Sequence, residues 1–180
     1  DESSYPEKGA LIKCNPAIKK KSDREALIDA LNSGKLDVIA TDHAPHTLNE
    51  KSGNYFNTPA GLPLVQHALP ILFDLAKRGE ITHELIVDKA CHAPADLFGV
   101  VDRGYVREGY FADLVIVDTE KTYEVTKDNI LYKCKWSPFE GHIFSSSIQT
   151  TIVNGVIAYD NGKLTESIPG KKLNFNRSRN

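Results

Sequence analysis

The sequence predicts an α/β protein whose last third is a small β-rich module. Two observations support this prediction. A strand, a helix and a second strand follow one another with short joints in residues 10–41. After Gly104 the helical pattern of apolar residues gives way to short apolar runs typical of strands. We therefore divide the chain into residues 1–103 and 104–180.

The first unit has the order strand, helix, strand. An apolar run over residues 10–14 ends at Asn15-Pro16, as strands often do where a loop begins. Residues 22–25, Ser-Asp-Arg-Glu, form a capping box that predicts the start of a helix ending at Gly34. Residues 36–41 then predict a buried strand. Such a unit implies parallel strands covered by helices.

A long polar loop follows this second strand, over residues 42–58. Long loops inside compact domains are usually functional. Helical patterns come next: residues 62–78, bent or split at Pro70 and ended by Gly79; a helix capped by Thr82 and running to about Cys91; and a turn at residues 94–98 closed by Gly99.

The β module contains three strand-like runs before its end, at residues 112–118, 122–125 and 148–153. Asn154-Gly155 then separates the last run from another apolar run, and this dipeptide is a strong hairpin signal. The tail, residues 171–180, is basic, and we expect it to be loosely held.

Composition narrows the class of protein. The 180 residues are 41% hydrophobic and 26% charged, which is a globular balance, and the formal net charge of −2 argues against nucleic acid as a partner. No apolar run approaches a membrane span. Three widely spaced cysteines favour a reducing, cytoplasmic setting. Because methionine is absent and the chain opens on a loop-like segment, we expect a fragment of a longer protein.

Asp42 and His46 are the first candidates for chemistry. Asp42 directly follows an expected buried strand, at the end where ligands gather in α/β sheets and barrels. Its carboxylate can bind a metal or take up a proton, and His46 can hydrogen-bond an anion or a polar ring edge. Taken singly, each also has a structural interpretation, since aspartate often forms turns and loop histidines are often solvated.

Taken together, these residues resemble a known family. Asp42-His43-Ala44-Pro45-His46, following Val38-Ile39-Ala40-Thr41, looks like the last barrel strand of the dihydroorotases in the amidohydrolase superfamily. Four further stretches resemble that family in the same order: residues 13–19, KCNPAIK; 59–62, PAGL; 109–118, GYFADLVIVD; and 136–141, WSPFEG. The first motif resembles dihydroorotases in particular, and the 109–118 stretch resembles the whole superfamily.

The resemblance implies roles for five residues. Asp42 would be the metal-ligating carboxylate that also acts as general base and acid. Asn15 would contact the substrate ring and His46 the substrate carboxylate. Ala60 and Gly61 would offer main-chain groups to the ring amide.

Other residues depart from the family pattern or have structural interpretations. Ala17 and Lys19 stand where the family has proline and arginine. For His43 we expect local hydrogen bonding. We interpret four histidines as core, solvated or structural (His67, His83, His92, His142) and the cysteines as small core residues.

The resemblance also implies one or two zinc ions. In the family that this chain resembles, the zinc ligands are a His-x-His pair, a carboxylated lysine or an aspartate, two further histidines and a final aspartate. Of these ligands, only the final aspartate, Asp42, is in this chain. A (β/α)8 barrel takes about 250 residues. We therefore expect the C-terminal part of such a barrel followed by a small β-sandwich module, with the missing N-terminal part as its partner and a homo-oligomer as the assembly. Alone, the chain should bind zinc poorly and be inactive.

The predicted activity of the whole protein is dihydroorotase. Hydroxide held by zinc would hydrolyse the cyclic amide of L-dihydroorotate reversibly to N-carbamoyl-L-aspartate, a step of de novo pyrimidine synthesis, while Asp42 moves a proton to the leaving nitrogen. Three alternatives remain open: another cyclic amidohydrolase, such as a dihydropyrimidinase or allantoinase; a non-catalytic scaffold, for instance for aspartate transcarbamoylase; and a self-standing β-rich binding module.

Overall fold

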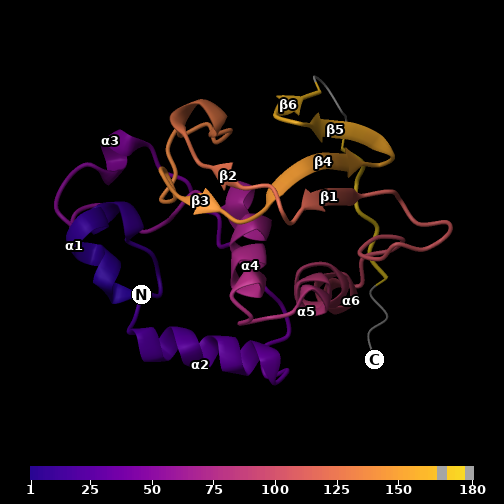
Figure 1. Cartoon of the computed structure of the whole chain (residues 1–180), viewed down its shortest axis with the longest axis horizontal. Coiled ribbons are helices and arrows are strands. Elements are labelled where there is room, and N and C mark those ends of the chain that lie inside the picture. Colours follow the sequence, from indigo (N-terminus) through magenta and orange to yellow (C-terminus); the bar gives the residue numbers. More distant parts are fainter. Residues whose placement is uncertain (166–169, 177–180) are drawn as a thin grey trace.

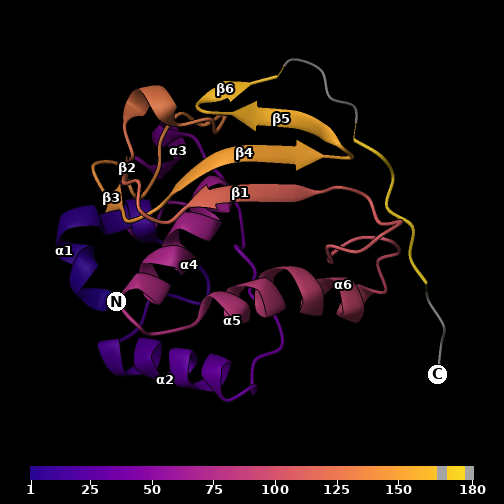
Figure 2. The ribbon, with the colours of Figure 1, turned by 45° about the vertical axis from the view of Figure 1, so that its right-hand side comes forward.

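A computed structural model describes residues 1–165 and 170–176. The strands lie on one side of α4 (Ala68–Lys77) and α2 (Lys21–Asn32) lies on the other (Figures 1 and 2). The remaining α-helices are short: α1 Tyr5–Lys8, α3 Leu48–Lys51, α5 His83–Val87 and α6 Ala93–Phe98. Brief 3-10 segments cover η1 Glu2–Ser4, η2 Gly9–Ile12, η3 Val65–His67 and η5 Lys127–Asn129, and η4 (Asp88–His92) is a π-helical turn.

Helix α2 ends as predicted but begins differently. Gly34 has φ +74°, and its N–H and that of Lys35 bond back to the carbonyls of Leu31 and Ala30, which is a Schellman ending. At the start, the predicted box of residues 22–25 is wrong. The Asp23 carboxylate instead accepts from the N–H of Lys20, so the helix starts one residue earlier than Ser22.

Helices are confirmed in the three later regions, but the first is divided before Ala68, between η3 and α4, and not at Pro70 as predicted. Pro70 falls in the first turn of α4, where its missing N–H costs no helical bond. The Thr82 hydroxyl accepts from the N–H of Leu85 and caps α5. Helical structure then continues through η4 and α6, past the predicted end at Cys91, to Gly99 in the left-handed conformation.

Within residues 1–165 and 170–176 the strands form two antiparallel sheets. One has the order β1-β4-β5-β6 and the other pairs β2 with β3. Their bounds are β1 Leu114–Asp118, β2 Tyr123–Glu124, β3 Ile143–Phe144, β4 Ser147–Val153, β5 Val156–Asp160 and β6 Lys163–Leu164. The predicted hairpin at Asn154-Gly155 is confirmed: both residues have positive φ, and β4 pairs with β5 across them.

The two strands predicted in the first 41 residues are wrong. Residues 9–12 form a 3-10 turn, and residues 36–41 form no strand. A strand requires a neighbouring ladder. Within the described residues, the sole bridge near this region is a parallel one between His43 and Leu62. The Ile39 N–H bonds instead to the carbonyl of Lys89 in η4.

Three apolar clusters form the core of the part of the chain that the structure describes. The first joins α2, α4 and α5 through Leu31, Leu72, Ile81 and Ile86. The second packs the β2–β3 region onto Ile71 of α4 through Val125, Ile130, Tyr132 and Phe144. The third brings together Ile12, Leu62 and Trp136, from three distant parts of the sequence. This last cluster lies under the segments that carry the candidate site.

Two smaller expectations need correction. Part of the tail is held, because Asn174 and Asn176 pair with Val101 and Gly99 through main-chain hydrogen bonds; residues 177–180 lie outside the described residues. Cys91 is exposed rather than a core residue, whereas Cys14 and Cys134 are half-buried in the third cluster. Among the described residues, no helix is long and apolar enough to cross a membrane.

Candidate functional site

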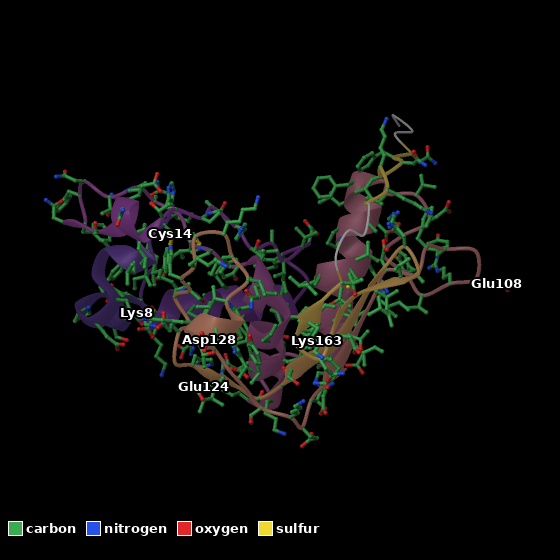
Figure 3. The ribbon with its side chains drawn as sticks, turned by 90° about the horizontal axis from the view of Figure 1, so that it is seen from above. Lys8, Cys14, Glu108, Glu124, Asp128 and Lys163 are labelled. Atoms are coloured by element: carbon green, nitrogen blue, oxygen red, sulfur yellow. The ribbon has the colours of Figure 1, made fainter. Side chains whose placement is uncertain are left out.

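Three segments that contain the predicted site residues are joined by main-chain hydrogen bonds. The Gly61 N–H donates to the carbonyl of Lys13 over 2.9 Å, and the Ala44 N–H donates to that of Leu62 over 3.0 Å. Segment 13–15 therefore adjoins segment 59–62, which in turn adjoins segment 42–46. Cys14 marks this end of the molecule, far from Glu108 in the loop before β1 (Figure 3).

Asp42 presents its carboxylate to solvent. Its φ is +47°, in the left-handed region that aspartate enters more readily than most residues. The side chain is exposed and has no hydrogen-bond partner in the part of the chain that the structure describes. Residues held in rare backbone conformations cluster at functional sites. Asp42 is thus available to bind a ligand or to move a proton, which is what its predicted role requires.

His46 is half-buried and has one ring nitrogen occupied. Its Nε2 lies 3.1 Å from the carbonyl oxygen of Ala60, and because that oxygen only accepts, Nε2 carries the proton. Its Nδ1 lies 4.0 Å from Oε2 of Glu50, whose pKa is lowered chiefly by the Thr47 N–H and less by His46. With the proton on Nε2, a neutral ring offers only a lone pair at Nδ1, so a substrate carboxylate would contact Nδ1, beside Glu50, only when the ring is doubly protonated. That contact stays a prediction.

His43 makes the local hydrogen bonds that the sequence predicts. Its Nδ1 accepts from the N–H groups of Leu64 and Val65, over 3.0 and 3.3 Å. The ring also packs on Tyr132, with 5.4 Å between centroids. His43 thus fixes the start of η3 relative to the loop that carries Asp42.

Gly61 occupies a position that leaves no room for a side chain. Its φ is +139°, and a Cβ there would lie 2.4 Å from the Ala44 oxygen and 3.0 Å from Nε2 of His46. Its N–H donates to Lys13 and its carbonyl accepts from the Lys51 ammonium. By contrast, the Ala60 N–H has no partner among the described residues. The sequence predicted that both Ala60 and Gly61 contact the substrate through main-chain groups. Of these two residues, Ala60 is the one whose N–H is free to donate.

Two residues at this site were missed or given no role by the sequence. The Trp136 indole donates to the carbonyl of His46 over 2.7 Å, and the side chain is 2% exposed. Lys51 is also 2% exposed and binds three carbonyls. Trp136 lies in a motif that resembled the family, so a signal existed. Lys51 had none, because a lysine in a polar loop usually remains solvated.

Asn15 and Lys19 are both exposed at the protein surface. Asn15 is exposed and follows Cys14 in the segment that adjoins Gly61. The Lys19 ammonium donates to the carbonyl of Ala17 within its own loop, over 3.0 Å. The predicted contact of Asn15 with a substrate ring stays a prediction, and Lys19 is used locally.

A cavity of about 340 Å³ opens beside the loop that contains His43 and His46. It is lined by His43, Pro45, His46, Thr47, Glu50 and Tyr132, with Lys133 and Cys134. A second, mostly apolar hollow of about 400 Å³ lies between η3, α4 and the four-stranded sheet. The first cavity holds polar groups suited to a small ligand.

The described residues do not by themselves fit a zinc ion. They include no group of three or more histidine, cysteine, aspartate or glutamate side chains placed to hold a metal. Zinc sites in proteins use three or four such ligands. Of the predicted zinc ligands, Asp42 alone is present, and one carboxylate does not make a site.

Comparisons with known proteins identify the family of the chain. Residues 10–158 match the sequence pattern of the Amidohydrolase family. The chain belongs to the amidohydrolase family. Among curated relatives, this amidohydrolase chain is 38% identical over 165 residues to the dihydroorotase of Halobacterium salinarum, covering 92% of the chain and 39% of the relative. It is 37% identical to that of Clostridium acetobutylicum, covering 84% and 36% respectively.

Solved structures support the same fold. The L-hydantoinase (dihydropyrimidinase) of Arthrobacter aurescens superposes with a TM-score of 0.85 at 24% identity, covering 91% of this chain and 38% of that one. A D-hydantoinase gives a TM-score of 0.83 at 22% identity, with the same coverage. At these identities the likeness concerns the fold. The chain spans less than two fifths of the length of these relatives.

Proposed function

We propose that the chain is the C-terminal part of a dihydroorotase, a cytoplasmic and homo-oligomeric enzyme that interconverts L-dihydroorotate and N-carbamoyl-L-aspartate. The observation that carries this proposal is the joining of segments 13–15, 42–46 and 59–62 by hydrogen bonds. Each segment contains a residue that the dihydroorotase resemblance assigns to the site. Identities of 33–39% to eight curated dihydroorotases support it further.

The chain's own residues have distinct parts in this proposal. Asp42 would exchange a proton with the reacting amide through its exposed carboxylate. The Ala60 N–H would donate to the substrate ring, and Asn15 would contact the same ring from the neighbouring segment. His46 would orient the substrate carboxylate as an imidazolium, donating from Nδ1 to the carboxylate while Nε2 donates to the Ala60 carbonyl.

The architecture of the whole enzyme is part of the proposal. The chain matches only 36–39% of each dihydroorotase, so we infer that further barrel strands and a partner sheet for the β module come from other residues of the same protein. Zinc would be held by Asp42 together with ligands outside this chain. Because the described residues do not hold zinc alone, we assign it no step here.

A dihydropyrimidinase-like activity is the second candidate. The Glu50 carboxylate lies 4.0 Å from Nδ1 of His46, the nitrogen that would take the substrate carboxylate. A negative charge there disfavours an anionic substituent and favours an uncharged ring such as dihydrouracil. The solved structures of similar fold are hydantoinases and dihydropyrimidinases, although at these identities they indicate fold and not substrate.

The deciding experiment compares the two rings directly. The full-length protein that contains this chain is assayed with L-dihydroorotate and with dihydrouracil, before and after chelation and with zinc restored. Zinc-dependent turnover of dihydroorotate supports the proposal, and turnover of dihydrouracil instead favours the second candidate. Turnover of neither ring would favour the scaffold alternative. The isolated chain is the control, and activity in it would contradict the assignment of further ligands to other residues.

A further inference from the structure

Lys51 is a buried cation without a carboxylate partner in the described part of the chain. It is the last residue of α3 and is 2% exposed. Its ammonium donates to the carbonyls of Lys13, Pro59 and Gly61, over 3.2, 3.0 and 3.2 Å. An ammonium has three protons, and here each has an acceptor. Burying a charge is costly unless it is fully hydrogen-bonded, so this arrangement depends on all three carbonyls.

The three carbonyls belong to the two segments that contain Asn15 and Ala60, the residues proposed to contact the substrate ring. Lys13 precedes Asn15 by two residues, and Pro59 and Gly61 flank Ala60 on either side. While its neighbours' carbonyls are bound by Lys51, the Ala60 carbonyl binds Nε2 of His46. One ammonium therefore sets the direction of the peptide groups before and after the residue that has a free N–H.

We propose that Lys51 is a positioning residue, which holds the Pro59–Gly61 main chain against the Lys13–Asn15 segment so that Ala60 faces the substrate. The inference rests on the proposed function for the identity of the substrate, but the link between Lys51 and Ala60 can be tested without it. Lys51 does not touch the reacting atoms. It acts through the main chain of two segments.

Lys13 provides a matched comparison. Its ammonium also binds three carbonyls, those of Tyr55, Phe56 and Thr58, over 2.8, 3.2 and 2.7 Å. These belong to the outer part of the same loop and do not flank Ala60. Replacing the Lys13 side chain therefore also removes three charge-assisted hydrogen bonds, but leaves the Pro59 and Gly61 carbonyls on Lys51.

The experiment uses the full-length protein with Lys51→Met, Lys51→Arg and Lys13→Met. We expect Lys51→Met to raise KM for dihydroorotate roughly tenfold to a hundredfold, with a smaller change in kcat, because a misplaced binding group weakens binding before chemistry. Lys51→Arg keeps the charge but not the compact three-way geometry, so KM should stay raised. Lys13→Met should lower thermal stability with a much smaller change in KM.

Hydrogen exchange supplies the readout that does not depend on activity. The Gly61 amide is bonded to the Lys13 carbonyl, and its exchange should accelerate in Lys51→Met more than in Lys13→Met. Equal KM values and equal Gly61 exchange in the two variants would overturn the inference. If the wild-type protein turns over no dihydroorotate, the proposed function fails, and the exchange comparison still decides the role of Lys51. If Lys51→Met does not fold, Lys51→Gln takes its place.

Discussion

The indole nitrogen of Trp136 donates a hydrogen bond to the main-chain carbonyl of His46, 90 residues earlier in the sequence. The bond measures 2.7 Å, and the ring packs with Ile12 and Leu62 in the third apolar cluster. The connection between β2 and β3 thereby fixes the loop that carries Asp42 and His46. A structural role follows for Trp136 in a motif whose family likeness alone assigns it none.

Replacing Trp136 should loosen this loop. Trp136→Phe keeps most of the packing but leaves the His46 carbonyl without its donor, which should cost about 1–3 kcal/mol of unfolding free energy. Urea unfolding followed by circular dichroism measures this loss, and proteolysis of residues 47–58 should become faster. Phe144→Leu, in the second cluster, is the control: it should lower stability without speeding that cleavage. Equal cleavage in both variants would refute the link.

Gly61 should tolerate no side chain. In Gly61→Ala the new Cβ would lie 2.4 Å from the Ala44 oxygen, so the two segments must separate and substrate binding should weaken at least tenfold. Gly53→Ala is a close control, because Gly53 has a similar φ of +151° but its Cβ would meet only Thr58 Cγ2 at 3.6 Å. Both variants therefore place alanine in a strained backbone conformation, but only Gly61→Ala adds a clash, with the Ala44 oxygen. Similar losses of binding in the two would show that strain, and not the clash, decides.

Buried His67 should make the fold sensitive to acid. Its side chain is fully buried, Nδ1 contacts Ser137 and Tyr132, and Nε2 has no partner among the described residues. Burial, with a smaller effect of His142, lowers the pKa of His67 to about 4 from 6.5. Because the unfolded chain then binds more protons than the folded one, stability is complete above pH 6.5 and falls as the pH drops towards 4.

The measurement is the unfolding free energy between pH 4 and pH 7.5. His67 should contribute a slope of about 1.4 kcal/mol per pH unit in the window below pH 6.5. His67→Phe should flatten the profile there, even if it lowers stability at neutral pH. His83→Gln, at an exposed position, should leave the profile unchanged. A profile of the same slope in His67→Phe would assign the acid sensitivity to another group.

Asp113 should act through stability and not through substrate. Its carboxylate pairs with Arg103 and accepts from the N–H of Asn154 over 2.7 Å, while Arg103 also donates to the Asn154 side chain. Asp113→Asn should therefore cost about 1–3 kcal/mol of unfolding free energy and leave KM unchanged in the full-length protein. Asp160→Asn, at an exposed position of β5, should change stability by less than about 0.5 kcal/mol. A raised KM in Asp113→Asn would contradict this assignment.

Local signals predicted the parts of the fold that depend on local chemistry. The Thr82 cap, the Gly34 ending and the Asn154-Gly155 hairpin each depend on a few neighbouring residues, and each is confirmed. The strands expected at residues 10–14 and 36–41 depend on neighbours distant in sequence. Their apolar character correctly indicated burial of Ile12, but burial does not create a ladder.

Some features of the candidate site could likewise be predicted from short stretches of sequence, and others could not. The prediction that Asp42, His46 and Gly61 are site residues came from motifs that resemble a family, and the structure places their segments side by side. The sequence could not predict that the N–H and carbonyl of Gly61 are already hydrogen-bonded, or that Lys51 is buried. Both features depend on which main-chain carbonyls point inward once the loop has folded. Pattern reasoning identifies side chains more readily than it identifies the direction of peptide groups.

Trp136 is the one tryptophan in the sequence. Excitation at the red edge of the aromatic absorption therefore reports on a single indole, whose N–H is bonded to the loop of Asp42 and His46. Its emission gives an optical signal for any ligand, metal or variant that shifts this loop in the isolated chain. The chain thus carries its own spectroscopic label at the place where its chemistry is expected.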